Sequence, residues 1–596
     1  MAFLVVVLVV FVVLGGRLVY LQATPPAEYT AFAERQLVHT MTLPAARGAI
    51  FDRNGRELAL SVRQSTIWVN PRQVTDPAGQ AAQLAPILGL DPVVIQDKLS
   101  KDAAFVYLAR TVPDAVAAQV TALNMPGVHM IEEPKRFTPA ADLAGPLLGR
   151  VGTDNEGLSG LELQFEKTLA GKAGSQVVEQ TPAGTPYDGV RKRTPSVRGD
   201  DLVLTIDRSL QFETERALSN EIVTANALGG IAMVMDSATG EILALANLSK
   251  NPDGAGPPVP SEKLTALTNV YEPGSVNKLI TISGALEEGA VKADEVLAVP
   301  GTIKVADHVF KEHDPHPTVQ WSVTDIMANS SNVGSIMIGQ KLGKDGIDKY
   351  LRAYGFGERT GLAFPGESRG LMLEPKKWSG TSIGTIPIGQ GIAVTAVQML
   401  AAYNTVANGG EYVAPKLVKA TLDAKGQEHP TPPSDRHRVI SERTAKQVTG
   451  MLSEVVRVGT GTAAAIDGYT VAGKTGTARK PLENARGYKQ GAYMSSFAGF
   501  VPAERPRLTA MVMLDEPTPI FGGLVAAPVF AEITRYGLRQ FRIPPPPPQS
   551  APVPAVSPEV ARSGSGEPVT GVNGPVSTAP AASVASTTTS PPTTSP

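Results

Sequence analysis

The chain opens with an almost entirely apolar segment. Residues 1–14 are an unbroken apolar run, and residues 18–21 extend it beyond Arg17. A helix needs about 20 residues to cross the hydrocarbon of a bilayer, and the run reaches that length if the Arg17 side chain extends toward the interface. The pattern predicts a membrane anchor over residues 1–21, with a cleaved signal peptide as the alternative. Basic residues that would orient the helix are missing before it.

Residues 22–207 alternate short apolar runs with loops. Examples are the segments Ser65–Val69 and Val128–Ile131, in which apolar and polar residues mix over a strand-like length. Such runs between loops are typical of short strands in an α+β region. No catalytic constellation stands out here, so we expect this region to have a supporting role.

The pattern changes over residues 208–542. Residues 231–235 are apolar, and residues 241–245 are apolar after Glu241; a polar turn lies between them, which predicts a β-hairpin. Apolar helical segments follow, and strand patterns return at residues 469–471, 496–501 and 508–514. Strands at both ends with helices between them favour an antiparallel sheet flanked by helices, so the chain as a whole is predicted to be α+β and multidomain.

The last segment, residues 543–596, has a different composition. It is mostly Pro, Ser, Thr, Ala, Val and Gly, and includes five consecutive prolines at residues 544–548. A segment of this kind cannot bury enough apolar surface to offset the entropy lost on ordering. We therefore expect a disordered tail.

Length and composition limit the number of domains, the partners and the chemistry that the chain can have. The chain has 596 residues, enough for two to four domains at roughly 150 residues each. Lys and Arg total 54 against 56 Asp and Glu, so no basic field favours nucleic acid as a partner. There is no cysteine, which excludes disulfides, zinc–thiolate sites and thiol catalysis.

The first candidate motif is Ser275-x-x-Lys278, at the expected start of an apolar helix that runs to Leu286. Residues three apart share one side of a helical turn, so the hydroxyl and the amine face the same way. A serine needs a neighbouring base to act as a nucleophile, and a lysine whose pKa is lowered can be that base. Helix N-terminal amides would favour a developing oxyanion. Alternatively, Ser275 is only a helix cap and Lys278 a solvated charge.

The second candidate motif is Ser330–Ser331–Asn332, after the apolar segment at residues 323–327. A Ser-x-Asn loop offers a hydroxyl for proton transfer and an amide that can hold a substrate carbonyl. Taken alone, a turn or a helix cap explains these residues equally well.

The third candidate motif is Lys474–Thr475–Gly476–Thr477. On an edge strand, Lys474 supplies a cation for a substrate carboxylate, and the Thr475 and Thr477 hydroxyls supply donors. Gly476 leaves room for a substrate backbone. The alternative is an ordinary edge strand protected by a lysine.

Together the three motifs resemble one known set. Ser-x-x-Lys, Ser-x-Asn and Lys-Thr-Gly, in this order, are the signature of penicillin-binding proteins and serine β-lactamases. Residues 47–55 (RGAIFDRNG) and 157–162 (GLSGLE) resemble boxes of the class B penicillin-binding proteins. Residues 202–211, 236–241 and 389–398 are similar to the same family.

The residues Glu272–Ser275 and Ser330–Asn332 resemble the cell-division (FtsI-like) branch of that family more than the elongation branch. Asn277 departs from the pattern, because many relatives carry Phe there. It points elsewhere on the helix than Ser275 and Lys278, so we expect little effect on chemistry.

The resemblance implies a role for each motif residue. Lys278 would take the proton of Ser275, which would attack the penultimate D-Ala carbonyl of a stem peptide, and Ser330 would help to protonate the departing D-Ala. Asn332 would hold the donor amide. Lys474, Thr475, Gly476 and Thr477 would bind the terminal carboxylate, and the backbone N–H groups of Ser275 and Thr477 would form the oxyanion hole.

The resemblance also implies an architecture and a setting. We expect a single-pass anchor in the cytoplasmic membrane, an elongated α+β pedestal of the dimerisation type over residues 22–207, and an extracytoplasmic transpeptidase domain over residues 208–542. Expected partners are peptidoglycan stem peptides, β-lactams, a membrane-embedded glycosyltransferase and other division proteins. Alternatives are an elongation-type enzyme, a β-lactamase or D,D-carboxypeptidase, and a non-enzymatic division scaffold.

Neither a metal nor a cofactor is expected. His313 and His316 are spaced as metal ligands can be, but adjacent prolines prevent a regular helix and no further ligand is evident nearby. Residues 389–391 do not follow a phosphate-loop pattern.

Overall fold

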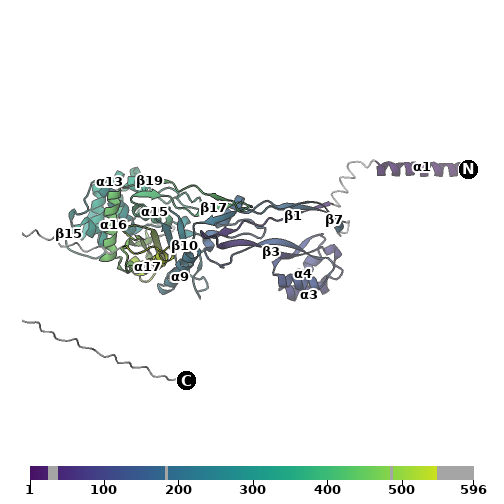
Figure 1. Cartoon of the computed structure of the whole chain (residues 1–596), viewed down its shortest axis with the longest axis horizontal. Helices are drawn as coiled ribbons and strands as arrows, with labels where there is room; N and C mark the ends of the chain where they lie inside the picture. Colours follow the sequence, from purple (N-terminus) through teal and green to yellow (C-terminus); the bar gives the residue numbers. More distant parts are fainter. Residues whose placement is uncertain (24–37, 181–185, 255, 483–486, 547–596) are drawn as a thin grey trace, which may run out of the picture. The chain divides into compact units, whose positions relative to one another are not determined.

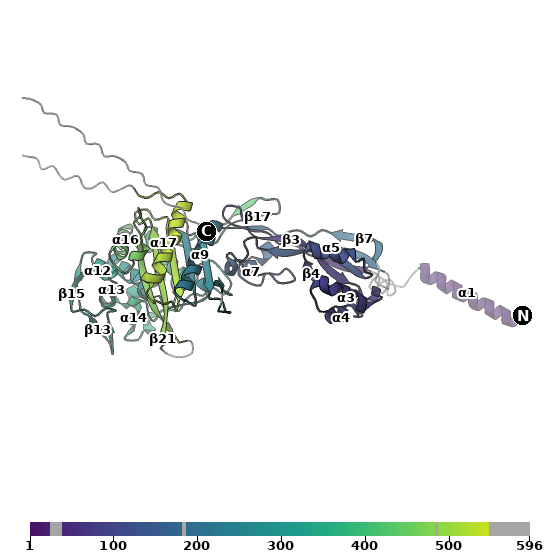
Figure 2. The same ribbon diagram turned by 90° about the horizontal axis from the view of Figure 1, so that it is seen from below.

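A computed structural model describes residues 1–23, 38–180, 186–254, 256–482 and 487–546 (Figures 1 and 2). The expected tail lies outside the described residues, except for its first few. Helix α1 (Ala2–Ala23) has a mean hydropathy of 2.8 and no buried residue. At about 1.5 Å per residue, its length suffices to cross a bilayer. The predicted apolar helix is confirmed, and it suggests a membrane anchor.

The N-terminal region after α1 mixes strands and short helices. Its strands are β1 (Val38–Leu43), β2 (Ile50–Phe51), β3 (Glu57–Val69), β4 (Val106–Val112), β5 (Val128–Phe137), β6 (Gly174–Gln180), β7 (Pro186–Thr194) and β8 (Asp201–Leu204). Its helical segments are η1 (Pro71–Gln73), α3 (Pro77–Leu88), α4 (Pro92–Leu99), α5 (Asp114–Ala122), α6 (Gly145–Leu148), α7 (Gly160–Gln164) and α8 (Glu166–Leu169). The strands predicted around residues 65–69 and 128–131 are confirmed as parts of β3 and β5, which pair antiparallel.

Helices α3, α4 and α5 cover one face of the β3–β4–β5 sheet. Ile67 and Val69 of β3 share a buried cluster with Leu84 of α3 and Ile95 of α4. Asp76 and the residue that precedes α4 accept hydrogen bonds from free N–H groups at the starts of these helices. Ile67 and Val69, two residues apart on β3, thus lie on the face of the strand that the helices cover.

A buried ionic cluster links residues 47–55 to residues 157–162, the two boxes named in the sequence analysis. Arg47 is 2% exposed; its guanidinium donates to the carboxylate of Glu162 at 2.9 Å and lies 2.7 Å from the carboxylate of Glu166. Arg136 donates to the other oxygen of Glu162 at 2.6 Å. A buried charge is tolerated only when it is paired and hydrogen-bonded, so this cluster fixes the mutual position of the two boxes.

The first box also contacts the start of the C-terminal region. Asp52 is fully buried, and its carboxylate accepts hydrogen bonds from the backbone N–H groups of Asn54 at 2.8 Å and Arg208 at 3.2 Å. The Asn54 amide donates to Asp207, which caps helix α9. These contacts tie the turn at residues 52–55 to the first helix of the next region.

The C-terminal region contains the remaining elements. Its strands are β9 (Gly229–Asp236), β10 (Ile242–Ser249), β11 (Val259–Pro260), β12 (Val296–Val299), β13 (Thr302–Val305), β14 (His308–Lys311), β15 (Val319–Ser322), β16 (Glu411–Val413), β17 (Val418–Leu422), β18 (Glu428–Pro430), β19 (Arg436–Arg438), β20 (Ala472–Pro481), β21 (Tyr488–Val501) and β22 (Leu508–Asp515). Its helices are α9 (Arg208–Thr224), α10 (Thr265–Thr268), η2 (Gly274–Asn277), α11 (Lys278–Glu287), α12 (Val323–Ala328), α13 (Asn332–Ala353), η3 (Pro375–Lys377), α14 (Ser382–Thr385), η4 (Ile386–Ile388), α15 (Ala396–Ala407), α16 (Glu442–Arg457), η5 (Thr462–Ala464) and α17 (Gly522–Gln540).

An antiparallel sheet of six strands forms the centre of this region, in the order β11-β10-β9-β22-β21-β20. Val234 packs with α9 and α17 on one face, whereas Met233 and Met235 pack with α11 and α15 on the other. Helices therefore cover both faces, which explains why residues 231–235 are apolar throughout rather than alternating. The predicted hairpin and the antiparallel sheet flanked by helices are confirmed.

Two details differ from the sequence-based expectation. The strand predicted at residues 469–471 is wrong: Gly468 adopts a positive φ of 81°, the chain turns there, and β20 begins only at Ala472. In addition, β17 leaves the C-terminal region and pairs with β8, so it extends the sheet of the N-terminal region through β2. Long-range pairing of this kind leaves no local sequence signal.

The Arg47 cluster yields a stability prediction. Glu162→Gln removes the charge shared by Arg47 and Arg136, whose side chains are 0% and 9% exposed. We expect a loss of about 3–5 kcal/mol in the free energy of unfolding, because the Arg136 guanidinium stays buried without its ion-pair partner and Arg47 keeps only Glu166. Denaturant unfolding, followed by circular dichroism, measures this loss.

The matched control is Glu132→Gln. Glu132 pairs with Arg63 at 3.3 Å, but both side chains are largely exposed, at 68% and 85%. We expect a change within about 0.5 kcal/mol. Equal losses for the two variants would contradict the importance given to the buried cluster.

Candidate active site

Ser275 lies in a tight turn that leads into helix α11. Gly274 has a φ of 61°, residues 274–277 form the 3-10 turn η2, and α11 begins at Lys278. Ser275 is half-buried and caps neither segment, since no side chain caps η2 or α11. Its hydroxyl therefore has no structural role as a cap at this helix start.

Backbone contacts with the segment around Gly389 fix this turn. The Gly274 N–H donates to the Gly389 carbonyl at 3.0 Å, and Gly389 has a φ of 78°. A Cβ at Gly389 would lie 2.1 Å from the Gly274 carbonyl oxygen. Two further donors hold the turn from outside: the Tyr403 hydroxyl bonds the Val276 carbonyl at 3.0 Å, and the buried Asn277 amide bonds a carbonyl of η4 at 2.9 Å. Asn277 thus anchors the turn.

The amine of Lys278 is buried and held by the second motif. Lys278 is 0% exposed, and its Nζ donates to the Ser330 carbonyl at 2.5 Å, the Ser330 Oγ at 3.3 Å and the Asn332 Oδ1 at 2.8 Å. Burial lowers the pKa of this amine to about 7, although the Glu312 carboxylate acts in the opposite direction. A lysine of this kind exchanges a proton near neutral pH.

The second motif combines a strained residue with a helix cap. Ser330 has a φ of 57°, which is uncommon for a residue with a side chain. Ser331 caps helix α13 by accepting from the Gly334 N–H at 2.8 Å. Asn332 is the first residue of α13. The cap at Ser331 therefore turns the two flanking side chains, Ser330 and Asn332, toward Lys278.

The third motif lies on β20, the edge strand of the sheet. Lys474 is 0% exposed, and its Nζ donates to the Thr475 carbonyl and hydroxyl, both at 3.3 Å. Burial, together with the nearby charge of Lys278, lowers the pKa of Lys474 well below its ordinary value. Thr475 hydrogen-bonds the Thr460 hydroxyl at 2.6 Å, which adds a residue that sequence analysis had missed.

The turn with Ser275 lies directly against β20. A Cβ at Gly476 would lie 2.4 Å from Ser496 Oγ and 3.2 Å from a methyl of Val276. A Cβ at Gly274 would lie 3.1 Å from the Cβ of Ala478. The missing side chains allow this close approach. The structure thus brings all three predicted motifs together around one site.

Two acidic residues near the motifs were missed as site residues. Glu312 accepts hydrogen bonds from Ser331 Oγ, the Asn332 N–H and the Val333 N–H. Glu272 accepts hydrogen bonds from the Gly391 N–H and from the Tyr488 hydroxyl, both at 2.9 Å. Each is separated in sequence from the groups it contacts, so spacing could not reveal it.

The two histidines set aside as metal ligands have aromatic neighbours instead. His313 meets the ring of Phe521 edge-on at 5.5 Å, and His316 meets the ring of Trp321 at 4.8 Å. Among the residues that the structure describes, no group of three or more His, Asp or Glu could hold a metal ion.

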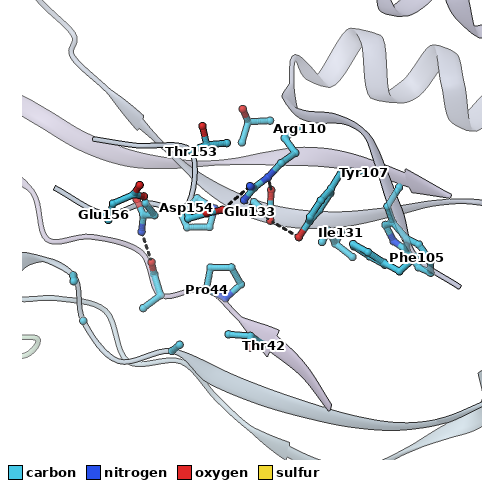
Figure 3. A pocket seen from close by; sticks show the side chains of 18 of the residues that line it. Thr42, Pro44, Phe105, Tyr107, Arg110, Ile131, Glu133, Thr153, Asp154 and Glu156 are labelled. Carbon is cyan, nitrogen blue, oxygen red and sulfur yellow. Dashed lines mark hydrogen bonds and ion pairs between the residues drawn. The ribbon is translucent and has the colours of Figure 1, made fainter. Parts of the chain in front are cut away.

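A separate cavity of about 690 Å³ lies in the N-terminal region. Trp68, Phe105 and Tyr107 form an aromatic wall, with Trp68 and Phe105 stacked at 4.7 Å. Figure 3 shows Arg110 extending to Glu133, to which it donates at 3.0 Å. No residue of the three motifs lines this cavity, so it does not belong to the site around Ser275.

Two stretches of the chain match known protein families. Residues 42–204 match the penicillin-binding protein dimerisation domain, and residues 230–535 match the penicillin-binding protein transpeptidase domain. The second stretch contains all three motifs. The fold and the site therefore define a penicillin-binding protein in which a transpeptidase domain follows a dimerisation domain.

Relatives that match along most of their length define the branch. The penicillin-binding protein PbpB of Mycobacterium tuberculosis is 34% identical over 573 residues, which cover 90% of this chain and 84% of the relative. The peptidoglycan D,D-transpeptidase FtsI of Escherichia coli is 31% identical over 553 residues, covering 90% and 91%. The chain belongs to the class B penicillin-binding proteins, as its motifs and boxes predicted.

Solved structures agree with this assignment. A peptidoglycan synthetase from Bifidobacterium adolescentis superposes with a TM-score of 0.69 at 32% identity, covering 86% of this chain and 98% of that one. Penicillin-binding protein 3 of Mycobacterium tuberculosis, complexed with aztreonam, superposes with a TM-score of 0.67 at 30% identity, covering 85% and 99%.

The contact between Gly389 and Gly274 yields a second prediction. Gly389→Ala places a methyl group 2.1 Å from a carbonyl oxygen in addition to straining a positive φ. We expect a loss of about 3 kcal/mol or more in the free energy of unfolding, because the backbone on both sides has to move. Thermal unfolding of the purified protein measures it.

Gly361→Ala is the control for this substitution. Gly361 has a φ of 87°, but a Cβ there meets nothing within 4 Å. Strain alone should cost about 1–2 kcal/mol. If the two variants lost the same stability, close approach would not be what requires glycine at residue 389.

Proposed function

We propose that this protein is a serine D,D-transpeptidase that cross-links peptidoglycan stem peptides through an acyl-enzyme on Ser275. The observation that carries the proposal is the buried Lys278 amine, one helical turn from Ser275, with a pKa lowered to about 7. An amine of this kind is free to accept a proton at neutral pH, as a general base must. Membership of the class B family supports the same reaction.

In the proposed acylation, Lys278 takes the proton of the Ser275 hydroxyl. The Oγ attacks the carbonyl carbon of the penultimate D-Ala, and the backbone N–H groups of Ser275 and Thr477 stabilise the oxyanion. The close packing of η2 on β20 supports this pairing of donors. Ser330, whose Oγ lies 3.3 Å from Lys278 Nζ, relays the proton that Lys278 has taken to the leaving D-Ala amine as the tetrahedral intermediate collapses and the C–N bond breaks.

The third motif is proposed to bind the terminal carboxylate of the donor. The low pKa of Lys474 reflects burial without a counter-ion, so an arriving carboxylate restores the charged form and pairs with it. The hydroxyls of Thr475 and Thr477 add donors, and Gly476 leaves room for the peptide backbone. Asn332 holds the donor amide.

In the proposed second step, an amine of a neighbouring stem peptide attacks the acyl-enzyme and forms the cross-link, while Ser275 regains its proton. β-Lactams acylate Ser275 because their amide and carboxylate mimic the D-Ala-D-Ala end. The aztreonam complex of the similar penicillin-binding protein 3 supports β-lactam binding. The likeness to FtsI, together with the division-type motifs, supports a role in septal wall synthesis.

The proposed setting is the outer side of the cytoplasmic membrane. Helix α1 anchors the chain, and the remainder lies outside, because the peptidoglycan substrate is found there. We propose a membrane-embedded glycosyltransferase and other division proteins as partners, since a transpeptidase acts on glycan strands that another enzyme polymerises. This assignment of partners rests on the family resemblance.

Labelling with a fluorescent penicillin tests the nucleophile and its base. We expect Ser275→Ala to abolish covalent label and Lys278→Ala to slow labelling by about 10²–10⁴-fold, the range that general-base catalysis contributes. The measurement is the rate of label incorporation on denaturing gels, with thermal unfolding to verify that each variant folds.

Ser219→Ala and Lys292→Ala serve as controls, because neither residue belongs to a motif; both should label at the wild-type rate. Undiminished labelling of Ser275→Ala would disprove the proposed nucleophile. Rapid release of hydrolysed penicillin over many turnovers would indicate a β-lactamase instead.

The lowered pKa of Lys278 predicts how acylation depends on pH. Only the neutral amine accepts a proton, so below the pKa the rate constant should fall about tenfold per pH unit. Above pH 7 it should level off, because Lys278 is already neutral. The test is the second-order acylation constant on both sides of pH 7. A rate that keeps rising toward pH 10 would mean that Lys278 titrates as an ordinary lysine.

A further inference from the structure

The carboxylate of Glu312 is buried at the start of helix α13. Its side chain is 5% exposed, and it follows directly on β14. One oxygen accepts from Ser331 Oγ and from the Val333 N–H at 3.1 Å, and the other accepts from the Asn332 N–H at 2.7 Å. The Glu312 carboxylate therefore binds the cap residue Ser331 and the first two residues of α13.

These contacts reach the proposed base through one residue. Asn332 receives the hydrogen bond of Glu312 on its backbone N–H and the hydrogen bond of Lys278 on its side-chain oxygen. The Asn332 amide nitrogen also donates to the Lys311 carbonyl at 3.4 Å, next to Glu312 in the chain. If Glu312 moved, Asn332, one of the two residues that hold the Lys278 amine, would lose the hydrogen bond on its backbone N–H.

Three titratable groups face this cluster from different elements. Lys278 comes from α11 and Lys474 from β20, and the charge of Lys278 lowers the pKa of Lys474 further than burial alone does. His316, in the same loop as Glu312, has its Nε2 at 3.9 Å from the carboxylate, buried without a hydrogen bond. Glu312 is the acidic group in this set, and its charge favours the ammonium form of Lys278.

We propose that Glu312 is a positioning residue for acyl transfer: it holds the Ser330–Asn332 loop against the Lys278 amine, and its negative charge sets the pH at which Lys278 becomes a base. The inference rests on the proposed function. Both carboxylate oxygens are required as acceptors, because a glutamine would offer one acceptor and one amide donor. That donor would face either the Asn332 N–H or the Val333 N–H and repel it.

The experiment measures the pH dependence of penicillin acylation in Glu312→Gln, Glu312→Asp and wild type. The acid limb is the part of the pH profile, below the pKa of Lys278, in which the acylation rate falls. In Glu312→Gln this limb should move to lower pH by roughly one pH unit, because removing the negative charge destabilises the ammonium form of Lys278. The plateau rate should fall about tenfold to hundredfold, because the loop loosens. In Glu312→Asp the acid limb should stay at the wild-type pH, since the negative charge remains. The plateau rate should still fall, because the shorter aspartate side chain does not reach the start of α13 as well.

Two further variants separate charge from other causes. Asp76→Asn removes a carboxylate that caps α3 in the N-terminal region, and it should leave both limb and plateau unchanged. His316→Asn should leave the limb in place; if it moved the limb as far as Glu312→Gln does, the limb would report the imidazole and the inference would fall.

The outcomes separate the inference from the proposed function. If wild type is labelled on Ser275 and the limb of Glu312→Gln does not move, the inference alone fails. If Ser275→Ala still labels, the proposed function fails and the inference fails with it. Should Glu312→Gln not fold, Glu312→Asp decides: an unmoved limb with a lower plateau supports the inference, and a limb shifted to lower pH overturns it.

Discussion

Two buried lysine amines, those of Lys278 and Lys474, set the electrostatics of the site around Ser275. Lys278 and Lys474 are both fully buried, and neither amine hydrogen-bonds a carboxylate among the described residues. Burial lowers the pKa of Lys278 to about 7, and burial together with the charge of Lys278 lowers the pKa of Lys474 well below its ordinary value, so both amines lose protons more readily than exposed lysines do. The roles proposed for the two lysines, a proton acceptor at Lys278 and an anion site at Lys474, both depend on this burial. The neighbouring carbonyl, amide and hydroxyl groups then supply the hydrogen bonds that a buried amine requires.

Close backbone approach is the second requirement, and glycine provides it. The turn with Ser275 packs on β20 at Gly476 and on the segment around Gly389, where a methyl group would meet backbone or side-chain atoms. The elements concerned come from distant parts of the chain: a helix, the loop before α13 and an edge strand. The remaining packing of the region, with helices on both faces of the sheet, holds these elements at the distances the chemistry needs.

Sequence patterns predicted the elements whose cause is local. The apolar helix at the N-terminus, the hairpin at residues 231–245 and the strands β3, β5, β21 and β22 follow from the periodicity of apolar residues. The strand expected at residues 469–471 was misplaced, because Gly468 turns the chain before β20 begins. Asn277 was expected to have little effect on chemistry; the structure adds that its buried amide anchors the turn with Ser275 through a carbonyl of η4.

The family and the motif residues could be predicted from the amino-acid sequence, because Ser-x-x-Lys, Ser-x-Asn and Lys-Thr-Gly combine a fixed order with residue types that acyl transfer requires. The groups that surround these motifs could not be predicted, and they emerge from the folded chain. The contact of Glu312 with the start of α13, the pairing of β17 with β8 and the Arg47–Glu162 cluster join residues far apart in the chain. Burial and electrostatic coupling depend on distance in space, and the spacing of residues along a chain does not contain that distance.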